Sequence, residues 1–123
     1  MVIVNDGFDK MVAAVFAIID TAAYGTSTTT VDVTNTAIGG KVNDTDKIVS
    51  KSSATGSVSI VHEVLSTEGN GNTFGNYGIE DSTTTLLMNN NLTPLAKDST
   101  KEVITTTTFF MEVNWVSVKQ VGN

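Results

Sequence analysis

The first apolar residues of the chain recur at the spacing of an amphipathic helix. Steps of three and four residues join six of them: Phe8, Met11, Val12, Val15, Phe16 and Ile19. Residues at this spacing share one helix face, so we predict a helix over about residues 7–20 with Asp6 as its N-cap. The opposite face carries small or apolar residues in place of charges: Ala13, Ala14, Ala17 and Ile18. Such a helix is either buried in its own domain or packs its second face on another subunit, and we take the six-residue stripe as the candidate oligomer or attachment interface.

Beyond the helix, apolar and polar residues alternate, which is the pattern of a strand with one buried face. In residues 56–65 the inward set is Val58, Ile60, His62 and Val64. The longest alternation lies near the end of the chain and places on one face Val103, Thr105, Thr107, Phe109, Met111, Val113 and Trp115. We predict strands over 56–65 and 102–118. The second exceeds the usual length of a strand, so we expect a bulge to divide it near Phe109-Phe110.

Four shorter strands are predicted, at residues 30–33, 47–51, 74–79 and 84–89. Gly and Asn tolerate positive φ, so Gly69-Asn70-Gly71-Asn72 predicts a hairpin turn or loop tip. Pro94 lacks a backbone N–H and is expected to stop the strand before it. The fold class that follows is mainly β, an antiparallel β-sandwich-like domain with one N-terminal α-helix. We expect a single domain over residues 1–123, β-rich from 30 to 118.

The composition strengthens the β assignment. The chain has 123 residues, among them twenty Thr, eleven Asn, ten Ser and ten Gly. Thr is β-branched and favours strands, whereas Asn, Ser and Gly favour turns. Cysteine is absent, so disulfides and thiolate metal sites are excluded.

Charge and hydropathy argue against two classes of partner. Nucleic-acid recognition draws on clustered Lys and Arg, but the seven Lys are scattered, Arg is absent and the net charge is −6. We therefore expect no nucleic-acid partner. No apolar run reaches the roughly 18 residues that span a bilayer, so we expect no membrane partner either.

Catalytic chemistry finds little support in the sequence. The single histidine, His62, lies on the inward face of its predicted strand while Glu63 points the other way, so we interpret it as a structural core histidine. The acidic segments Asp44-Thr45-Asp46 and Glu80-Asp81 lack the further oxygen ligands of a calcium loop and are interpreted as solvated turns. We expect no enzyme activity, no cofactor, and no catalytic or metal-binding residues.

Several short motifs follow one another in a recognisable order. The first three are Asn5-Asp6-Gly7 before the helix, Tyr24-Gly25-Thr26-Ser27-Thr28-Thr29, and Asn35-Thr36-Ala37-Ile38-Gly39-Gly40-Lys41-Val42. The later ones are Glu68-Gly69-Asn70-Gly71, Tyr77-Gly78-Ile79-Glu80-Asp81, Thr85-Leu86-Leu87-Met88 and Thr93-Pro94-Leu95-Ala96-Lys97, closed by the strand from Val103 to Val113. In this order they resemble the N-terminal domain family of tailed-phage tail-fibre and tail-collar proteins. Two positions depart from the family pattern, because Tyr77 or Asn76 stands where a Glu is usual and Lys41 where an Arg is usual.

The resemblance covers nearly the whole chain and implies a β-sandwich-like domain with an N-terminal helix and with a strand that ends at the Gly25-Thr26 loop. It also implies a non-enzymatic structural protein, made in the host cytoplasm and located in the virion, at the tail or baseplate or on the capsid surface. The implied partners are further copies of the chain, as a homotrimer, and other virion proteins. Fibre proteins continue into a shaft, whereas this sequence stops at Asn123, so we expect a baseplate, collar or fibre-attachment role in place of receptor contact.

Two alternatives stay open at this point. The chain could be a host-surface glycan-binding module whose exposed loops present aromatic rings and amides to sugars, through Tyr77, Trp115 and the run Asn89-Asn90-Asn91. The competing interpretation of these residues places Trp115 in the core and the three Asn in a turn. The chain could also be a capsid decoration or turret protein.

Overall fold

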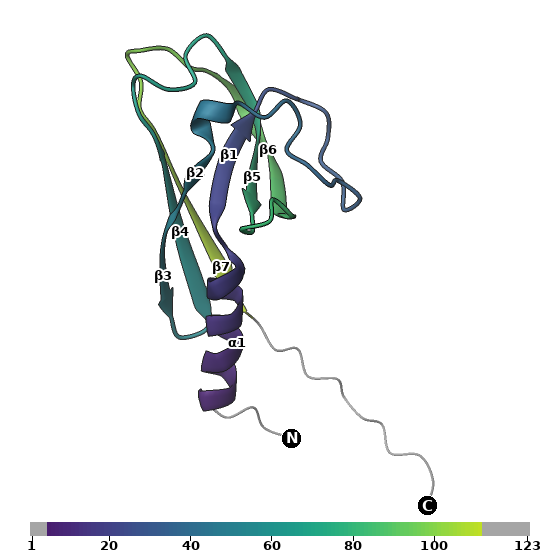
Figure 1. The fold of residues 1–123 in the computed structure, drawn as a ribbon, viewed down its shortest axis with the longest axis vertical. Coiled ribbons are helices and arrows are strands. Elements are labelled where there is room, and N and C mark those ends of the chain that lie inside the picture. The colour runs from purple at the N-terminus through teal and green to yellow at the C-terminus, as the bar shows by residue number, and fades with distance from the viewer. Residues whose placement is uncertain (1–4, 112–123) are drawn as a thin grey trace, which may run out of the picture.

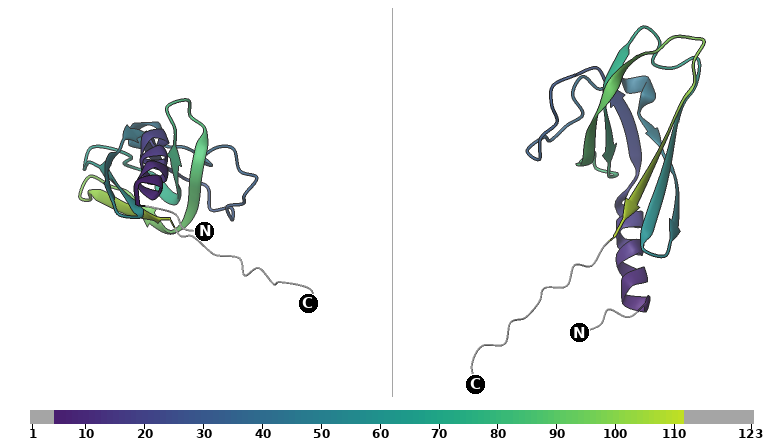
Figure 2. Two further views of the ribbon diagram at one scale, coloured as in Figure 1. Left: turned by 90° about the horizontal axis from the view of Figure 1, so that it is seen from below. Right: turned by 180° about the vertical axis from the view of Figure 1, so that it is seen from behind.

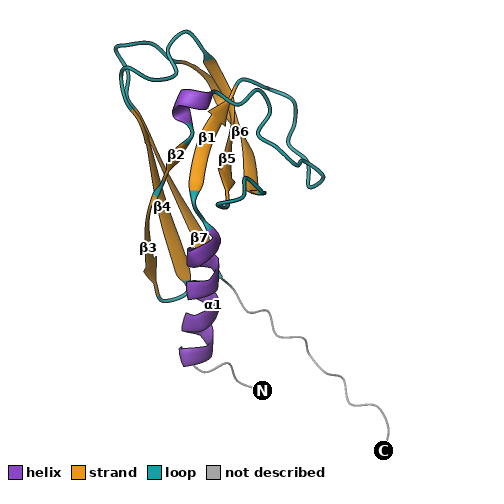
Figure 3. Ribbon diagram, in the orientation of Figure 1, coloured by secondary structure: helices purple, strands orange, loops and turns teal. Residues whose placement is uncertain are grey.

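The computed structural model describes residues 5–111, which form one α-helix and two antiparallel β-sheets (Figures 1 and 3). The elements in chain order are α1 (Asn5–Ile18), β1 (Thr21–Gly25), the 3₁₀ turn η1 (Asn43–Thr45), β2 (Lys47–Ile48), β3 (Ser50–Ala54), β4 (Ser57–Val64), β5 (Thr73–Glu80), β6 (Leu86–Ala96) and β7 (Val103–Phe110). One sheet has the strand order β2-β1-β5-β6 and the other has the order β3-β4-β7. The predicted class, mainly β and sandwich-like with an N-terminal helix, is confirmed.

The two sheets are joined along one side by a single extended segment. Its first part, β2, pairs with β1, and its second part, β3, pairs with β4. Val49 lies between the two parts, is buried, and donates its N–H to the carbonyl of Asp20 at 3.0 Å. The sandwich is therefore closed on the β2–β3 side, and β6 and β7 are the edge strands of the opposite side.

The core lies between the sheets and centres on four rings. Tyr24 on β1 stacks on Phe74 of β5 with ring centroids 4.5 Å apart. Tyr77 of β5 and His62 of β4 lie tilted against Tyr24, at 4.9 and 5.5 Å. The predicted alternation in β4 is confirmed, because the side chains of Val58, Ile60, His62 and Val64 are buried while their neighbours are not. Aromatic clusters of this kind bury a large apolar area in a small sheet.

Helix α1 continues the line of β1 and packs on the inner face of the three-stranded sheet (Figures 1 and 2). It begins at Asn5, so Asp6 lies in its first turn and is not the N-cap that was predicted. Its last turn contains no basic residue. Lys51 of β3 supplies that charge instead, donating from Nζ to the carbonyls of Phe16 at 2.7 Å and Ile19 at 2.6 Å. A cation at this end of a helix satisfies free carbonyls and the helix dipole.

The strand predictions need four corrections. Residues 30–33 lie in a loop, and residues 84–89 belong to a longer strand, β6, that continues past Pro94. β6 is an edge strand, and Pro94 lies in it between two register points, Leu95 opposite Phe74 and Asn91 opposite Asn76, where a bulge accommodates it. Turn residues 69–72 connect strands of different sheets, so they form a crossing loop and not a hairpin.

The fourth correction concerns the closing strand, β7, for which a bulge was predicted. β7 pairs with β4 in an unbroken register from Val103 opposite Val64 to Phe110 opposite Ser57, so no bulge divides it. The predicted continuation to residue 118, with Trp115, lies outside the described residues. In the described part of the chain, no helix has the length and apolarity that crossing a membrane requires.

Candidate functional site

The outer face of the four-stranded sheet is covered by the chain itself. The loop of residues 26–40 stands against β1 and β5 on the side away from the other sheet (Figure 2). Three glycines of β1 and β5 lie where the loop contacts these strands. A Cβ on Gly25 would overlap the carbonyl oxygen of Gly39, one on Gly75 would lie 2.6 Å from the carbonyl oxygen of Ser27, and one on Gly78 would overlap Ile38. Glycine in a strand marks such close backbone approach.

Asparagine side chains hold this loop in place. Asn76 donates from Nδ2 to the carbonyls of Gly39 at 2.8 Å and Ser27 at 3.1 Å. Asn91 accepts the N–H of Val31 at Oδ1 (2.8 Å) and donates from Nδ2 to the carbonyl of Thr29 (2.9 Å). The free edge of β6 is thus partly capped by the loop.

The residues predicted to form an exposed binding loop are placed differently. Asn89, Asn90 and Asn91 are strand residues of β6, and Tyr77 is a buried residue of β5. Asn89 donates to Tyr77 O at 2.8 Å and to Asn76 Oδ1 at 3.1 Å. The prediction of a loop is wrong because amide–backbone bonds outweigh the weak strand propensity of Asn. Of the four, Asn90 alone is exposed, and Trp115 lies outside the described residues.

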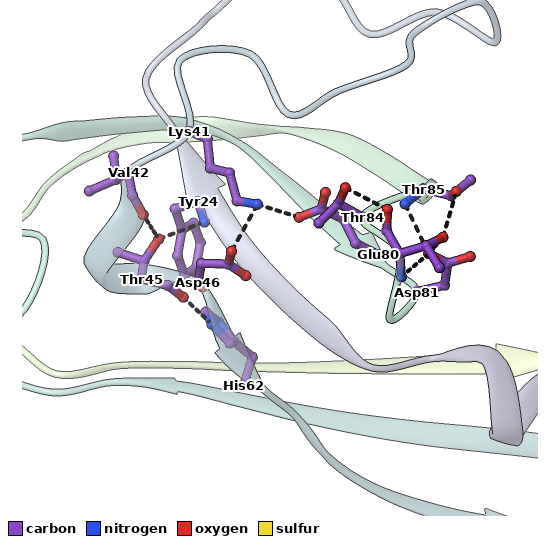
Figure 4. A network of polar contacts seen from close by, with 11 residues as sticks. Tyr24, Lys41, Val42, Thr45, Asp46, His62, Glu80, Asp81, Thr84 and Thr85 are labelled. Atoms are coloured by element: carbon purple, nitrogen blue, oxygen red, sulfur yellow. Dashed lines mark hydrogen bonds and ion pairs between the residues drawn. The ribbon is translucent and has the colours of Figure 1, made fainter.

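A buried polar network fixes the start of β2 to the aromatic core (Figure 4). Thr45 is its centre, since its Oγ1 accepts the N–H of Tyr24 at 3.0 Å and donates to the carbonyl of Val42 at 2.7 Å. His62 Nε2 lies 2.7 Å from the carbonyl oxygen of Thr45. A carbonyl only accepts, so Nε2 carries a proton. Burial lowers the pKa of His62, while the Thr45 contact opposes that shift.

Lys41 links this network to β5. Its Nζ pairs with Asp46 Oδ2 at 2.8 Å and with Glu80 Oε1 at 2.7 Å (Figure 4). Burial alone would lower the pKa of Lys41, but the hydrogen bonds and charges of the two carboxylates raise it overall. Glu80, predicted as a solvated turn residue, is buried, so that interpretation is wrong for it. Lys41 thus offsets part of the charge of two carboxylates, of which Glu80 is the buried one.

The network offers no reaction centre. His62 is buried, its Nδ1 has no partner among the described residues, and the groups in contact with it are two tyrosine rings and a backbone carbonyl. The charged groups of Lys47, Asp46 and Glu68 lie near enough to act on its pKa, in opposing directions. A general base must reach the proton that it removes, and substrate has no access here. Among residues 5–111 no three His, Asp or Glu side chains gather as metal ligands. We assign the network to stability.

The predicted helix stripe packs on the chain's own sheet. Val12 and Ile19 are buried, at 4% and 2% exposure, and Phe8, Val15 and Phe16 are half-buried. An interface through Val12 or Ile19 is therefore wrong, because their surface is already used. The part of α1 left for a partner is Met11 together with Ile18 of the second face.

No part of residues 5–111 covers the outer face of the three-stranded sheet, in contrast to its counterpart. Register and burial define its outward positions as Ser50, Ser52 and Ala54 on β3, Ser57, Ser59, Val61 and Glu63 on β4, and Ile104, Thr106, Thr108 and Phe110 on β7. Among these described positions Glu63 alone is charged. Large apolar side chains stand exposed here: Ile104 is 62% and Phe110 is 77% exposed. Exposed apolar side chains grouped on one face are a common feature of interaction surfaces.

Most of the apolar surface gathers at one end of that face. Ile48, Val61 and Leu65 line a shallow depression of about 300 Å³, together with Lys47, Ser50 and Glu63. Ile104 lies opposite Glu63, one row from Val61, at the β7 side of the depression. We call the four apolar residues Ile48, Val61, Leu65 and Ile104 the outer-face cluster. Phe110 lies at the other end of β7, opposite Ser57.

Among the strands that the structure describes, β7 pairs with β4 alone, so its other edge is unpaired there. Met111 donates its N–H to the carbonyl of Gly56 at 2.8 Å, on the β4 side. Backbone groups of a strand alternate in direction, so the N–H and C=O of the even-numbered residues 104–110 point away from β4. This strand, Val-Ile-Thr-Thr-Thr-Thr-Phe-Phe, has no charge, Pro or Gly. Those are the devices that protect edge strands from pairing.

A groove of about 590 Å³ separates the two edge strands. Its lining includes Ile79, Met88 and Leu92 from one sheet and Thr105 to Thr108 from the other. The hydroxyl of Tyr77 is buried in this groove, and none of the hydrogen bonds of the described residues includes it. The side chain of Thr107 lies near enough to oppose, in part, the rise in the pKa of Tyr77 that burial causes. Burial, helped by the charge of Tyr24, raises the pKa of Tyr77. The sandwich is thus incompletely closed on the β6–β7 side.

Comparison of the chain with protein-family models, with curated proteins and with solved structures gave no match. The site therefore rests on geometry: a bare sheet face, an unprotected strand edge and an open groove, all meeting at β7. The alternation in the sequence indicated only the face of β7 that carries Val103, Thr105, Thr107 and Phe109. Ile104 and Phe110 on the other face were the signal that could have found the surface.

Proposed function

We propose that the chain is a non-enzymatic, homo-oligomeric structural component of a tailed-virus particle, at the tail, baseplate, collar or fibre attachment. The order of short motifs resembling tail-fibre and collar N-terminal domains supports the viral setting. The bare outer face of the three-stranded sheet supports the assembly role and is the single observation that carries it.

The outer faces of the two sheets differ in how far the described chain covers them, and this difference supports an assembly role for the uncovered face. The chain commits a long loop and three strand glycines to covering the four-stranded sheet. On the other sheet, Val61 and Ile104 face outward, and Leu65 follows directly after β4. Ile48, at the junction of β2 and β3, is 80% exposed and lines the same depression as Val61 and Leu65. Exposed apolar area of this kind is stabilised when a partner covers it, at about 25 cal/mol per Å² removed from water.

The buried polar groups support a structural role over catalysis. His62, Thr45 and Glu80 each spend their hydrogen bonds on the fold, and the amides of Asn76, Asn89 and Asn91 hold the chain's own loop. Groups used in this way are not free to bind sugar hydroxyls or to move protons. The exposed apolar face is free.

Particle association tests the proposal. Particles released from infected host cells are purified, and the chain is sought by mass spectrometry. Infection is then repeated with the chain supplied as Val61→Lys, which places a charge in the outer-face cluster without touching the core. We expect the native chain in particles and the variant lost from them at equal expression.

Val33→Lys is the matched control, because Val33 is fully exposed on the loop of residues 26–40, away from the cluster. It should be incorporated like the native chain. Particles that lack the native chain, or that retain Val61→Lys as well as the control, would refute the proposal.

A further inference from the structure

We infer that the free edge of β7 pairs antiparallel with β7 of a second copy, about a twofold axis that passes through Thr107. The pairing joins two three-stranded sheets into one continuous sheet with the order β3-β4-β7-β7-β4-β3. This inference rests on the proposed assembly role, since it names a second copy of the chain as the partner of the same sheet.

The edge dictates which residues can pair. The N–H and C=O groups of Ile104, Thr106, Thr108 and Phe110 point away from β4, because Met111 N–H bonds to the β4 side. A twofold axis at Thr107 sets Thr106 opposite Thr108 of the second copy, and Ile104 opposite its Phe110. Every outward-directed backbone group of the strand then finds a partner.

Side-chain chemistry selects this register. Residues paired across a twofold axis perpendicular to the sheet lie on the same face, which requires even sums of residue numbers. With the axis at Thr107, the outer face receives an apolar pair at each end, Ile104 with Phe110, and Thr–Thr pairs between them. Such cross-strand pairs stabilise antiparallel sheets.

Pairing also completes the outer-face cluster. Phe110, isolated at the far end of its own β7, is carried to Ile104 of the other copy, beside Val61 and Leu65. The exposed ring of Phe110 in each chain thereby extends the outer-face cluster of the other copy. The same added strand lies over the groove beside Tyr77 and Met88, on the open side of the sandwich.

The uncharged edge of β7 offers no ion pair to an acidic or a basic partner, and it is a part of the chain that a second copy can approach without repulsion. The chain carries a net charge of −6, so most of its surface repels a second copy. β7 is uncharged from Val103 to Phe110, and antiparallel self-pairing there brings no like charges together. The contact is isologous and therefore closes as a pair. The homotrimer implied by the resemblance would need a different contact.

Cysteine cross-linking tests the register directly, since the chain has no cysteine of its own. In Thr107→Cys the two introduced thiols face each other across the axis at a non-hydrogen-bonded position, at about 4.5 Å between Cα atoms, within the range of a disulfide. Oxidation of the purified full-length variant should yield a covalent dimer. Ile104→Cys is the matched control, because its two copies lie six residues out of register, about 20 Å apart, and should stay unlinked.

A mixed experiment covers the case in which Thr107→Cys perturbs the groove. Ile104→Cys and Phe110→Cys chains, both altered at exposed outer-face positions, are mixed under reducing conditions and then oxidised. We expect a dimer whose mass contains one chain of each kind. The native chain should show a concentration-dependent monomer–dimer equilibrium by light scattering.

The results separate this inference from the proposed function. No cross-link in either experiment, an equal cross-link in Ile104→Cys alone, or a trimer without the Thr107→Cys link would overturn the pairing. The assembly role stands or falls on the particle experiment, whatever the cross-links show.

Discussion

Acidification should destabilise the fold through one residue, His62. Its ring is buried and neutral, with Nε2 donating to the carbonyl of Thr45 and Nδ1 unpaired among aromatic rings. Protonation would place a charge in this core, so the folded-state pKa lies below the ordinary value of 6.5. The unfolded chain binds the proton more readily, and stability therefore falls as pH decreases.

The size of the effect follows from linkage. Full stability is present above pH 6.5, and it is lost progressively as pH falls from 6.5 towards the lower folded-state pKa. One proton changes the free energy of unfolding by about 1.4 kcal/mol per pH unit at most. Between pH 7.5 and pH 5.5 we therefore expect a loss of up to about 1.4 kcal/mol. The carboxylates with lowered pKa values, such as Glu68, start from 4.5 or below and act at lower pH.

Urea unfolding followed by tryptophan fluorescence or circular dichroism at several pH values measures this slope. His62→Gln provides the comparison, because it removes the titrating group while keeping an amide donor. The variant should be less stable at every pH but flat between 7.5 and 5.5. A native chain that is equally or more stable at pH 5.5, or a variant that shows the same decline, would refute the burial of a neutral His62.

Two further predictions concern the loop and the helix. Gly25→Ala should cost about 2–3 kcal/mol, because its methyl group would overlap a carbonyl oxygen of the covering loop, and it should speed hydrogen exchange at the Ser27 amide. Gly71→Ala meets no atom within 4 Å, has only the strain of its φ of 84°, and should leave that amide protected. Lys51→Met should lower the free energy of unfolding by about 1–3 kcal/mol, through two lost bonds to helix carbonyls, as measured by urea titration. Lys10→Met on the exposed side of the helix should change it by less than about 0.5 kcal/mol, and equal losses in both variants would contradict the capping role of Lys51.

Hydrophobic periodicity was enough to predict the elements of which one face is buried by the chain itself. The helix was predictable from its stripe, and β4 from its alternation, which also placed His62 inside. Both signals arise locally, because spacing along the chain fixes which side chains share a face.

Other elements depend on contacts between distant segments. β1, Thr-Ala-Ala-Tyr-Gly, has small residues around one large ring, and its burial by β5 and the covering loop leaves no alternation. Asn89 to Asn91 favour turns by propensity, and only their bonds to Tyr77 and the loop make them strand residues. Pro94 stays within β6 because the bulge and the edge position require no N–H from it.

The candidate surface was hidden for a related reason. The alternation in the sequence predicted an inward face of β7, whose residues are half-buried in the structure, and assigned no role to the outward face. Whether an outward Ile104 or Phe110 is bare depends on whether something covers that sheet. Whether a sheet face is covered depends on tertiary contacts between distant segments. Here the loop of residues 26–40 covers the four-stranded sheet, and no described residue covers the outer face of the three-stranded one.

The described chain begins and ends at the same pole of the elongated fold (Figure 1). Phe8 near the start of α1 and Met111 after β7 both approach Gly56 in the β3–β4 turn. A force that pulls these two ends apart would break the hydrogen bonds between β4 and β7 one after another, beginning at Phe110. Strands pulled in this way yield at much lower force than strands sheared along their length. A second β7 zipped alongside would share that load, so a paired chain should resist extraction better than a single one.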